Sequence, residues 1–502
     1  MKKIKIQKNV YFDSVSLMLI TRDVKTLDGV KDANICMGTD HNKELLDNIG
    51  LLTNECKSCS PNDLIIALDG TEEFINNAEN VINESLTKKN TKSSKSSKYS
   101  SLKRAAEEFE KSNFVVISVP GEFAAAEAEI ALKLNKHVML FSDNVSIDEE
   151  VKLKTLAKEN QLLMMGPDCG TAIINGKPLG FANKVSSGNI GITGASGTGI
   201  QEVSTIIDKL GLGISQAIGT GGRDLSKNVN GIMMELGIEA LAGDNDTDVI
   251  ILISKPPHPD VATKIIEKAK TINKPFVINF LGQSQTATDN LIFCSTLEET
   301  AITACRLAAK KEEFDAESVG MPEMLDTEFT STQKYLRGLY TGGTLCDEAM
   351  LLSKGLIPEI YSNTPVKDCY ELKDPFISEK NAFVDLGDDT FTRGKPHPMI
   401  EPDTRNQRII QESKDPEVAV ILLDFVLGYG AHKDPVGICI PFIQEAQKNN
   451  PNLCFIASVT GTGKDPQDLN KQTTMLVENS VILASCNAQA AILAASIIKE
   501  IN

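Results

Sequence analysis

The sequence has no apolar run long enough to span a membrane, no excess of basic charge and no cysteine pattern typical of a disulfide framework. Its longest apolar runs, such as residues 249–253, are far shorter than the roughly 20 residues of a membrane-spanning helix. The 51 Lys and Arg against 68 Asp and Glu give a formal net charge of −17, which argues against the basic surface that binds nucleic acid. We expect neither membrane nor nucleic acid as a partner.

The first residues, MKKIKIQKNVYFDSVSLMLITRD, contain no sustained apolar segment and no small-residue cleavage site, so we expect no secretory signal. The eleven cysteines, an odd number in a large chain, indicate reduced thiols. Cys56 and Cys59 have the spacing of half a zinc site or of a redox pair, but no second pair follows, and we assign no metal. The protein is predicted to be cytoplasmic.

A chain of 502 residues holds about three structural units at roughly 150 residues each. The apolar runs at residues 64–68 and 114–119 are short, rich in β-branched residues and closed by Gly or Pro, which predicts parallel strands covered on both faces. With a helix-favouring segment and a further strand at residues 137–142, the second run forms a βαβ unit. We therefore predict an α/β fold whose first domain ends near Lys184, with a mobile Lys/Ser-rich insertion over residues 87–104.

The remaining chain contains an internal duplication. The strand-turn-helix at residues 194–198 pairs with the one at residues 340–344, and Gly219 pairs with Gly387. Residues 246–249 pair with 415–418, and residues 276–282 with 455–461. We predict two related doubly wound modules, joined by an acidic and polar linker at about residues 310–332. The alternative is that any two doubly wound α/β modules share this sequence pattern without a duplication.

The turn at residues 194–198 follows an apolar strand and opens a helix, with Ser196 or Thr198 as its cap. Such a turn directs backbone N–H groups at an anion, at the positive end of the helix dipole. It is neither a P-loop nor a clean G-x-G-x-x-G, and the alternative is an ordinary α/β turn. Further glycines would meet it at the carboxyl ends of the strands. The residues predicted to bind phosphate or a phosphorylated ligand are Gly194, Ala195, Ser196, Gly197, Thr198, Gly219, Gly221, Gly222, Arg223, Gly342, Gly343, Thr344, Gly387 and Asp388.

Histidines and cations stand at further strand tips, in the strings SKPPHP, GYGAHK and RGKPHP. Loop histidines are more often solvated or capping residues than catalysts, and that alternative stays open for each of them. An arginine is suited to clamp an anion with two parallel hydrogen bonds. The candidate catalytic residues are Lys255, His258, His432 and Arg393, with His397 comparable to the other histidines.

Three strings of the first half resemble the FdrA family, whose fold is similar to that of succinyl-CoA synthetase. They are VPGEFAAAEAE at 119–129, LFSDNVS at 140–146 and MGPDCGTAIINGKPLGFAN at 165–183. The resemblance spans nearly the whole chain. It implies a Rossmann-like CoA-binding-type domain over residues 1–184, followed by two flavodoxin-like ligase-CoA domains over residues 185–310 and 333–502.

Two departures from succinyl-CoA synthetase qualify the function that the resemblance implies. The segment PFVINFLGQSQTATD at 275–289 carries no His where the phosphorylated loop would lie, and no separate nucleotide-binding domain is evident. The FdrA resemblance implies a subunit of oxamate carbamoyltransferase in purine and allantoin catabolism, which converts oxalurate and phosphate to oxamate and carbamoyl phosphate. That reaction needs a bound phosphate and oxyanion donors, without ATP or phosphohistidine.

Two other functions are kept as alternatives. One is a nucleotide-dependent acyl-CoA synthetase similar to succinate–CoA ligase, and the other is a non-catalytic scaffold subunit. No cofactor is assigned; phosphate or carbamoyl phosphate is the expected ligand, with CoA or ATP as alternatives. The expected partners are a small anionic substrate and the other subunits of a multi-subunit enzyme, or further copies of this chain.

Overall fold

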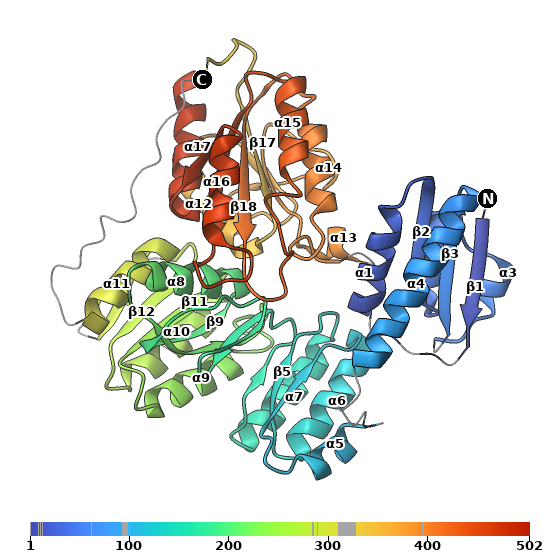
Figure 1. Cartoon of the computed structure of the whole chain (residues 1–502). Coiled ribbons are helices and arrows are strands. Elements are labelled where there is room, and N and C mark those ends of the chain that lie inside the picture. Colours follow the sequence, from blue (N-terminus) through green and yellow to red (C-terminus); the bar gives the residue numbers. More distant parts are fainter. Residues whose placement is uncertain are drawn as a thin grey trace. The chain divides into compact units, whose positions relative to one another are not determined.

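The structure is a computed structural model that describes residues 2–8, 10, 12, 14–61, 63–92, 99, 101–283, 286–288, 290–309, 328–393 and 396–502. The chain folds as two compact units (Figure 1). The first comprises Met1–Tyr99 and Thr392–Pro396, and the second comprises Ser100–Phe391 and His397–Asn502. In the described ranges, no helix combines the length and apolar character needed to cross a membrane.

The first unit is a three-stranded antiparallel sheet, in the order β1-β3-β2, covered by helices on both faces. One face packs Ile66 and Leu68 against α1 and α4. The other packs Ile65 and Ala67 against α2 and α3. Its elements are β1 (Lys2–Gln7), α1 (Ser14–Lys25), β2 (Val30–Met37), α2 (Asp40–Asn48), α3 (Asn54–Lys57), β3 (Leu64–Gly70) and α4 (Glu72–Lys92).

Two predictions for this region differ from the structure. The strand at residues 64–68 is antiparallel, because a continuous apolar run reports burial on both faces and not the direction of the neighbouring strands. The first unit ends at Tyr99, well before the boundary predicted near Lys184. Of the predicted loop at 87–104, residues 87–92 belong to α4 and residues 102–104 to α5, whereas 93–98 and 100 lie outside the described residues.

The second unit begins with a small parallel sheet, in the order β4-β5-β6, which confirms the predicted βαβ pattern. Its helices α6 and α7 bury Ala124, Ala128 and Leu153 together with Val138 and Leu140 of the middle strand. The elements are α5 (Leu102–Glu108), β4 (Phe114–Ile117), α6 (Gly121–Lys133), β5 (His137–Leu140), α7 (Ile147–Glu159) and β6 (Met164–Met165).

Two seven-stranded sheets follow, and their order confirms the predicted duplication. The first sheet runs β13-β12-β11-β9-β10-β7-β8, and the second runs β20-β19-β18-β14-β17-β15-β16. The five parallel strands of the first sheet have the spatial order fifth, fourth, third, first, second, and five of the seven parallel strands of the second sheet (β14, β17, β18, β19 and β20) have the same order, which is the flavodoxin-like arrangement. The mixed α/β class with two flavodoxin-like modules is therefore confirmed.

The first module extends one edge of its sheet with the antiparallel hairpin β7-β8. That hairpin lies before residue 185, in a segment that the sequence assigned to the first domain. The elements are β7 (Thr171–Ile174), β8 (Lys177–Gly180), β9 (Ser187–Ala195), α8 (Gly197–Lys209), β10 (Ile214–Gly219), α9 (Ile232–Gly243), β11 (Val249–Ser254), α10 (Pro259–Lys270), β12 (Phe276–Phe280), β13 (Leu291–Phe293) and α11 (Leu297–Ala309).

The second module starts after the predicted linker, of which residues 310–327 lie outside the described residues. All nine residues of its interior strand β18 are buried. The elements are β14 (Tyr335–Tyr340), α12 (Gly343–Ser353), β15 (Ile360–Ser362), β16 (Tyr370–Glu371), β17 (Asn381–Asp385), α13 (Asp389–Thr392), α14 (Asp403–Glu412), β18 (Val418–Val426), α15 (Ile440–Asn449), β19 (Cys454–Thr460), α16 (Leu469–Glu478), β20 (Val481–Ala484) and α17 (Asn487–Ile501).

One continuous apolar core joins the two modules. It includes Ile200 and Val203 of α8, Ala301 of α11, Leu345 of α12 and Ala491 of α17. Because each module contributes two helices to the same core, the beginnings of α8 and α12 are held against one another.

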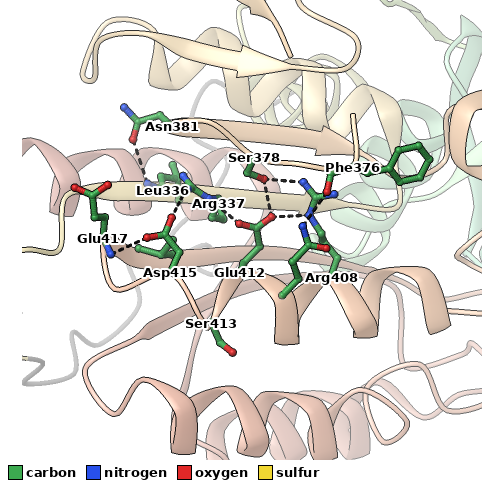
Figure 2. A network of polar contacts seen from close by, with 12 residues as sticks. Leu336, Arg337, Phe376, Ser378, Asn381, Arg408, Glu412, Ser413, Asp415 and Glu417 are labelled. Carbon is green, nitrogen blue, oxygen red and sulfur yellow. Dashed lines mark hydrogen bonds and ion pairs between the residues drawn. The ribbon is translucent and has the colours of Figure 1, made fainter. Parts of the chain in front are cut away.

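A buried ion-pair network stabilises the second module at β14 (Figure 2). Arg337 Nε lies 2.8 Å from Glu412 Oε2, and its Nη2 lies 2.9 Å from Asp415 Oδ2. The other oxygen of Glu412 accepts hydrogen bonds from Arg408 Nε and Ser378 Oγ, at 2.5 and 2.6 Å. The network ties the last turn of α14 to the buried strand.

Candidate active site

Polar residues from both modules gather at the carboxyl ends of the parallel strands. Lys255 directly follows β11 of the first module, and Asp385 is the last residue of β17 in the second. Asp347 lies in the second turn of α12. Ligands of open α/β sheets bind outside the carboxyl ends of the strands, so this cluster is the candidate active site.

Gly343, the first residue of α12, shows how closely these side chains approach one another. A Cβ added to it would lie 2.4 Å from Asp385 Oδ2 and 2.8 Å from Lys255 Nζ. Lys255 Nζ also lies 3.6 Å from Asp347 Oδ2. The ammonium of one module therefore stands beside two carboxylates of the other, and a larger residue at position 343 would push them apart.

Burial and charge change the protonation of this cluster. Burial raises the pKa of Asp385 to about 7, against the effect of Lys255 and together with that of Asp347. Burial also raises the pKa of Asp347, again against Lys255. For Lys255, burial acts to lower the pKa, but Asp347 and Asp385 outweigh it and the pKa is raised. A carboxyl group that titrates near neutrality beside a permanent ammonium is suited to proton transfer.

His397 and Asp168 border the cluster. A Cβ added to Gly387 would lie 2.7 Å from His397 Nε2 and 3.2 Å from Asp385 Oδ1. His397 Nδ1 accepts a hydrogen bond from Met399 N, and burial lowers the pKa of the ring to about 4, so Nε2 carries the proton of a neutral imidazole. Burial, followed by Asp143, raises the pKa of Asp168 to about 6.

The glycine-rich turn of the first module opens α8 as predicted. Gly194 and Ala195 complete β9, and Ser196 is the N-cap, its Oγ accepting a hydrogen bond from Gly199 N at 3.0 Å. The same Oγ donates to Thr344 Oγ1 of α12 at 2.7 Å. The two predicted turns therefore face one another in direct contact.

The turn of the second module already holds an anion that belongs to the protein. Asp424 Oδ1 accepts from Thr341 N at 2.7 Å, and Oδ2 accepts from Gly342 N at 2.8 Å. The prediction of a phosphate site at Gly342 is corrected accordingly, because a buried carboxylate fills the position where phosphate would meet these N–H groups. A tertiary contact over more than 80 residues left no signal in the local sequence.

The turn after β10 is closely packed for most of its length. A Cβ on Gly219 or Gly221 would lie 2.3 Å from a backbone oxygen, of Thr171 and Pro167 respectively, and Gly221 has φ +88°. These two glycines allow the backbone to pass close to its neighbours. A Cβ on Gly222 would meet only Asp168 Oδ2, at 3.5 Å.

Arg223, predicted as a phosphate-binding residue, has two partners within the protein. Its Nη2 pairs with the buried Glu150 Oε2 at 2.9 Å and donates to Val145 O at 2.8 Å. The fully buried Lys154 reinforces this link, since its Nζ lies 2.8 Å from both Glu150 Oε1 and Asp224 Oδ1. These ion pairs attach α7 to the turn, and Arg223, whose side chain is 41% exposed, stays a predicted phosphate-binding residue.

The other candidate catalytic residues lie apart from the cluster or have structural partners. His258 occupies the N-cap position of α10, with Nδ1 3.8 Å from Asp260. His432 Nδ1 accepts a hydrogen bond from Asp434 N at 3.1 Å. Asp388 accepts from Thr390 N at 2.9 Å, at the start of α13. Arg393 is exposed and belongs to the segment Thr392–Pro396 of the first unit.

Sequence reasoning missed Asp347, Asp385 and Asp168 as parts of the site. Asp385 could have been found, because it ends a buried strand two residues before the predicted ligand-binding Gly387. The position of Asp347 in the sequence is ordinary for an amphipathic helix. Only the approach of Lys255 from the other module gives this carboxylate an ion-pair partner.

Three family models match separate parts of the chain. Residues 1–102 match the family described as AllF, heavy metal-associated domain. Residues 185–282 match the CoA binding domain, and residues 339–497 match the CoA-ligase domain. The CoA-binding match thus falls on the first flavodoxin-like module, whereas the sequence had placed a CoA-binding-type domain over residues 1–184.

The chain is also similar to whole proteins and to parts of proteins. The chain is 47% identical over 502 residues to the uncharacterised protein YahF of Escherichia coli (strain K12), with 98% of each chain covered. It is 30% identical over 185 residues to subunit alpha 2 of an ADP-forming succinate–CoA ligase of Archaeoglobus fulgidus, covering 36% of this chain and 62% of that one. The apo form of the dinucleotide-forming acetyl-coenzyme A synthetase 1 of Ca. Korarchaeum cryptofilum superposes with a TM-score of 0.32 and 15% identity, covering 77% and 83% of the two chains.

The similarity to succinyl-CoA synthetase predicted from the sequence is thereby confirmed. The matches support the CoA-ligase-like alternative and lend no support to carbamoyl transfer, and the FdrA name stays a prediction.

The cysteines of the first unit do not fit the heavy metal that the family description mentions. Cys36, Cys56 and Cys59 are buried in one apolar cluster. Cys56 Sγ accepts a hydrogen bond from Thr53 Oγ1, Cys59 Sγ donates to Glu55 O, and burial raises the pKa of Cys36 to about 12. Metals bind thiolates, whereas burial disfavours the thiolate of Cys36, and the sulfurs of Cys56 and Cys59 already have hydrogen-bond partners within the protein. In the part of the chain that the structure describes, no three His, Cys, Asp or Glu side chains converge as metal ligands. All eleven cysteines are free thiols, as predicted.

Proposed function

Since the chain belongs to the same family as YahF and contains CoA-binding and CoA-ligase domains, we propose that it is an enzyme subunit that transfers an acyl group between phosphate and the thiol of CoA. The observation that carries the proposal is the approach of Lys255, in the CoA-binding module, to Asp385 at the end of β17 and Asp347 of α12, both in the CoA-ligase module. The reacting atoms lie where the two matched domains meet.

Lys255 supplies the positive charge that an acyl phosphate requires. Its ammonium stays protonated across the physiological range, because the flanking carboxylates raise its pKa. In the reaction, the thiol sulfur bonds to the carbonyl carbon and the bond from that carbon to the phosphate oxygen breaks. Lys255 stabilises the negative charge that collects on the departing phosphate.

Asp385 accepts the proton that the thiol releases as it attacks. Its pKa of about 7 is close to the pH at which a general base works best, and the neighbouring ammonium holds its charged form after the proton has moved. In the reverse direction, protonated Asp385 returns the proton to the departing thiolate.

The first turn of α8 is the proposed position for the phosphate groups of CoA. It lies in the segment that matches the CoA binding domain, and a Cβ on Gly197 would meet only Thr171, at 3.2 Å or more. The unpaired N–H groups of a helix N-terminus bind such anions. The phosphorylated histidine of succinyl-CoA synthetase would lie in residues 275–289, and none of the five histidines of the sequence falls there. The proposed transfer therefore starts from an acyl phosphate and does not use ATP.

The test mixes the purified full chain with CoA and acetyl or succinyl phosphate and measures thioester and phosphate together. We expect K255M and D385N each to lower the rate by about 10²-fold to 10³-fold, as losses of charge stabilisation in other enzymes do. K270M, which changes an exposed lysine of α10, should leave the rate unchanged. Thioester formation at equal rates in wild type, K255M and D385N would contradict the assignment, as would its absence with every acyl phosphate.

Carbamoyl transfer to phosphate is the second candidate, favoured by the missing histidine of the 275–289 segment. Here phosphate attacks the carbamoyl carbon of oxalurate, the carbon–nitrogen bond breaks, and protonated Asp385 supplies the proton to the departing nitrogen. This reaction needs the acid form of Asp385, whereas acyl transfer to a thiol needs the base form. Carbamoyl phosphate formed from oxalurate and phosphate, with a rate that falls as pH rises through about 7, would select it.

A further inference from the structure

The start of α12 is a complete anion site with an internal occupant. Asp424, in β18, receives hydrogen bonds on both oxygens from the backbone N–H groups of Thr341 and Gly342. Thr341 Oγ1 adds a third hydrogen bond to Oδ2, at 3.0 Å. Three donors converging on one fully buried carboxylate reproduce what a helix N-terminus offers to a phosphate.

Arg405 holds Asp424 from behind. Its side chain is 2% exposed, and Nη1 donates to the backbone oxygen of Asp424 and lies 3.6 Å from Oδ1. The guanidinium carbon stands 4.5 Å from the centre of the Phe425 ring. Burial raises the pKa of Asp424 above its usual value, although Arg405 and the donors at Thr341 and Gly342 oppose the shift. The carboxylate is therefore fixed by groups on both sides.

The first module has no carboxylate in the matching position. Gly194 and Tyr340 each lie three residues before the first residue of α8 and α12. Gly194 is paired with Ile253 in β11, whereas Leu339 is paired with Leu423, which places Asp424 beside Tyr340. An apolar residue thus stands in one module where an acidic residue stands in the other.

We propose that Asp424 is a specificity-determining residue that permanently fills the anion site of the second module, so that soluble phosphate or acyl phosphate is excluded there and binds only on the side of Lys255 and α8. The duplicated fold then has one open anion site and one closed. The consequence for substrate binding rests on the proposed function, but the closure itself does not.

Chemical rescue tests the closure without any activity assay. In the full-length D424A variant, formate supplies the missing carboxylate, and inorganic phosphate tests whether the opened site accepts the larger ion. We expect D424A to melt several degrees below wild type, because Thr341 N, Gly342 N and Arg405 lose a buried partner. Formate, compared with chloride at equal ionic strength, should restore several degrees by mass action.

Two further variants make the result interpretable. V420A removes a buried apolar group from the same strand and should lose stability without responding to formate. D424N keeps the shape of the side chain and should be stable enough to be measured if D424A is not, and its smaller acceptor capacity should weaken the cap.

Formate stabilising D424A but neither wild type nor V420A supports the proposal. Equal stabilisation of all three, or none in D424A, would overturn it, as would a melting temperature of D424N and D424A equal to that of wild type. If rescue succeeds while no acyl transfer is found, only the proposed function fails. If acyl transfer is found without rescue, only the closure fails.

Discussion

Glu202 and Glu348 occupy the same position in α8 and α12, five residues after the first residue of each helix. Glu202 Oε1 accepts from Asn487 N at 2.9 Å, at the start of α17 in the other module. Glu348 Oε1 accepts from Leu297 N at 2.7 Å, at the start of α11, again in the other module. Each module thus caps the last helix of its partner, which explains why the beginnings of α8 and α12 face one another.

Removing either carboxylate should destabilise the second unit. E202A and E348A each leave a buried backbone N–H without its acceptor, at an expected cost of about 1–3 kcal/mol in the free energy of unfolding. Urea unfolding measures the cost, with E267A on the exposed face of α10 as a control that should change it by less than about 0.5 kcal/mol. Because both glutamates contact Asn487, the double variant should deviate from additivity. Losses no larger than that of E267A would contradict the reciprocal capping.

The stability of the same contact should depend on pH. Burial raises the pKa of Glu348 from 4.5 to about 7. One backbone donor and one side-chain donor oppose this shift, whereas Glu202 and Glu298 add to it. The folded state then binds more protons than the unfolded state between these values. The free energy of unfolding should therefore fall as pH rises from about 4.5 through about 7, and E348Q should remove up to about 3 kcal/mol of that fall. Unfolding curves of both proteins at several pH values measure the difference, and identical pH dependence would refute the assignment.

The reaction rate should follow the protonation of Asp385. If Asp385 is the base in acyl transfer to a thiol, kcat/KM rises with pH and levels off above about 7, where the carboxylate is charged. D385N should lose both the rate and this inflection. G343A, whose added Cβ would lie 2.4 Å from Asp385, should lower the rate while leaving the CoA affinity of α8 largely unchanged. A profile with the same inflection in D385N would assign the proton transfer to another group.

The network around Arg337 should be sensitive to the loss of its shared carboxylate (Figure 2). E412A leaves Arg337 and Arg408, 2% and 4% exposed, without their buried counter-charge, and we expect a loss of about 3–5 kcal/mol. D415A removes a carboxylate that is 36% exposed and should cost clearly less. Equal losses of unfolding free energy in E412A and D415A would show that the burial of the removed carboxylate does not determine the cost. Acyl transfer should be unchanged in any E412A that remains folded, since the network lies apart from Lys255 and Asp385.

Lys154 should be needed for the turn that follows β10. K154M keeps the length of the side chain but leaves Glu150 and Asp224 buried beside Arg223 alone, and we expect about 3–5 kcal/mol of destabilisation. Hydrogen exchange should show faster opening of residues 219–224 than in K152M, a control on the exposed side of α7. If hydrogen exchange in residues 219–224 is unchanged in K154M, the stabilising effect of Lys154 is confined to α7.

The sequence by itself determined the fold class, the duplication and the location of the turns. Residues 249–253 and 418–423 are continuous apolar runs, which are typical of strands covered on both faces, and glycines mark the turns that open α8 and α12. The sequence offered Ser196 or Thr198 as the cap of α8, and the structure selects Ser196, whose side chain bonds to an N–H only three residues away.

The tertiary structure alone decided which of these turns is open and which residues do chemistry. Asp424 closes the turn at Gly342 from more than 80 residues away, and Arg223 is neutralised by Glu150, a partner on another helix. Lys255 meets Asp385 only because the two modules share a core. Such long-range pairings leave no periodic pattern in the sequence. They depend on which segments the fold brings close together in space, and not on the spacing of the residues along the chain.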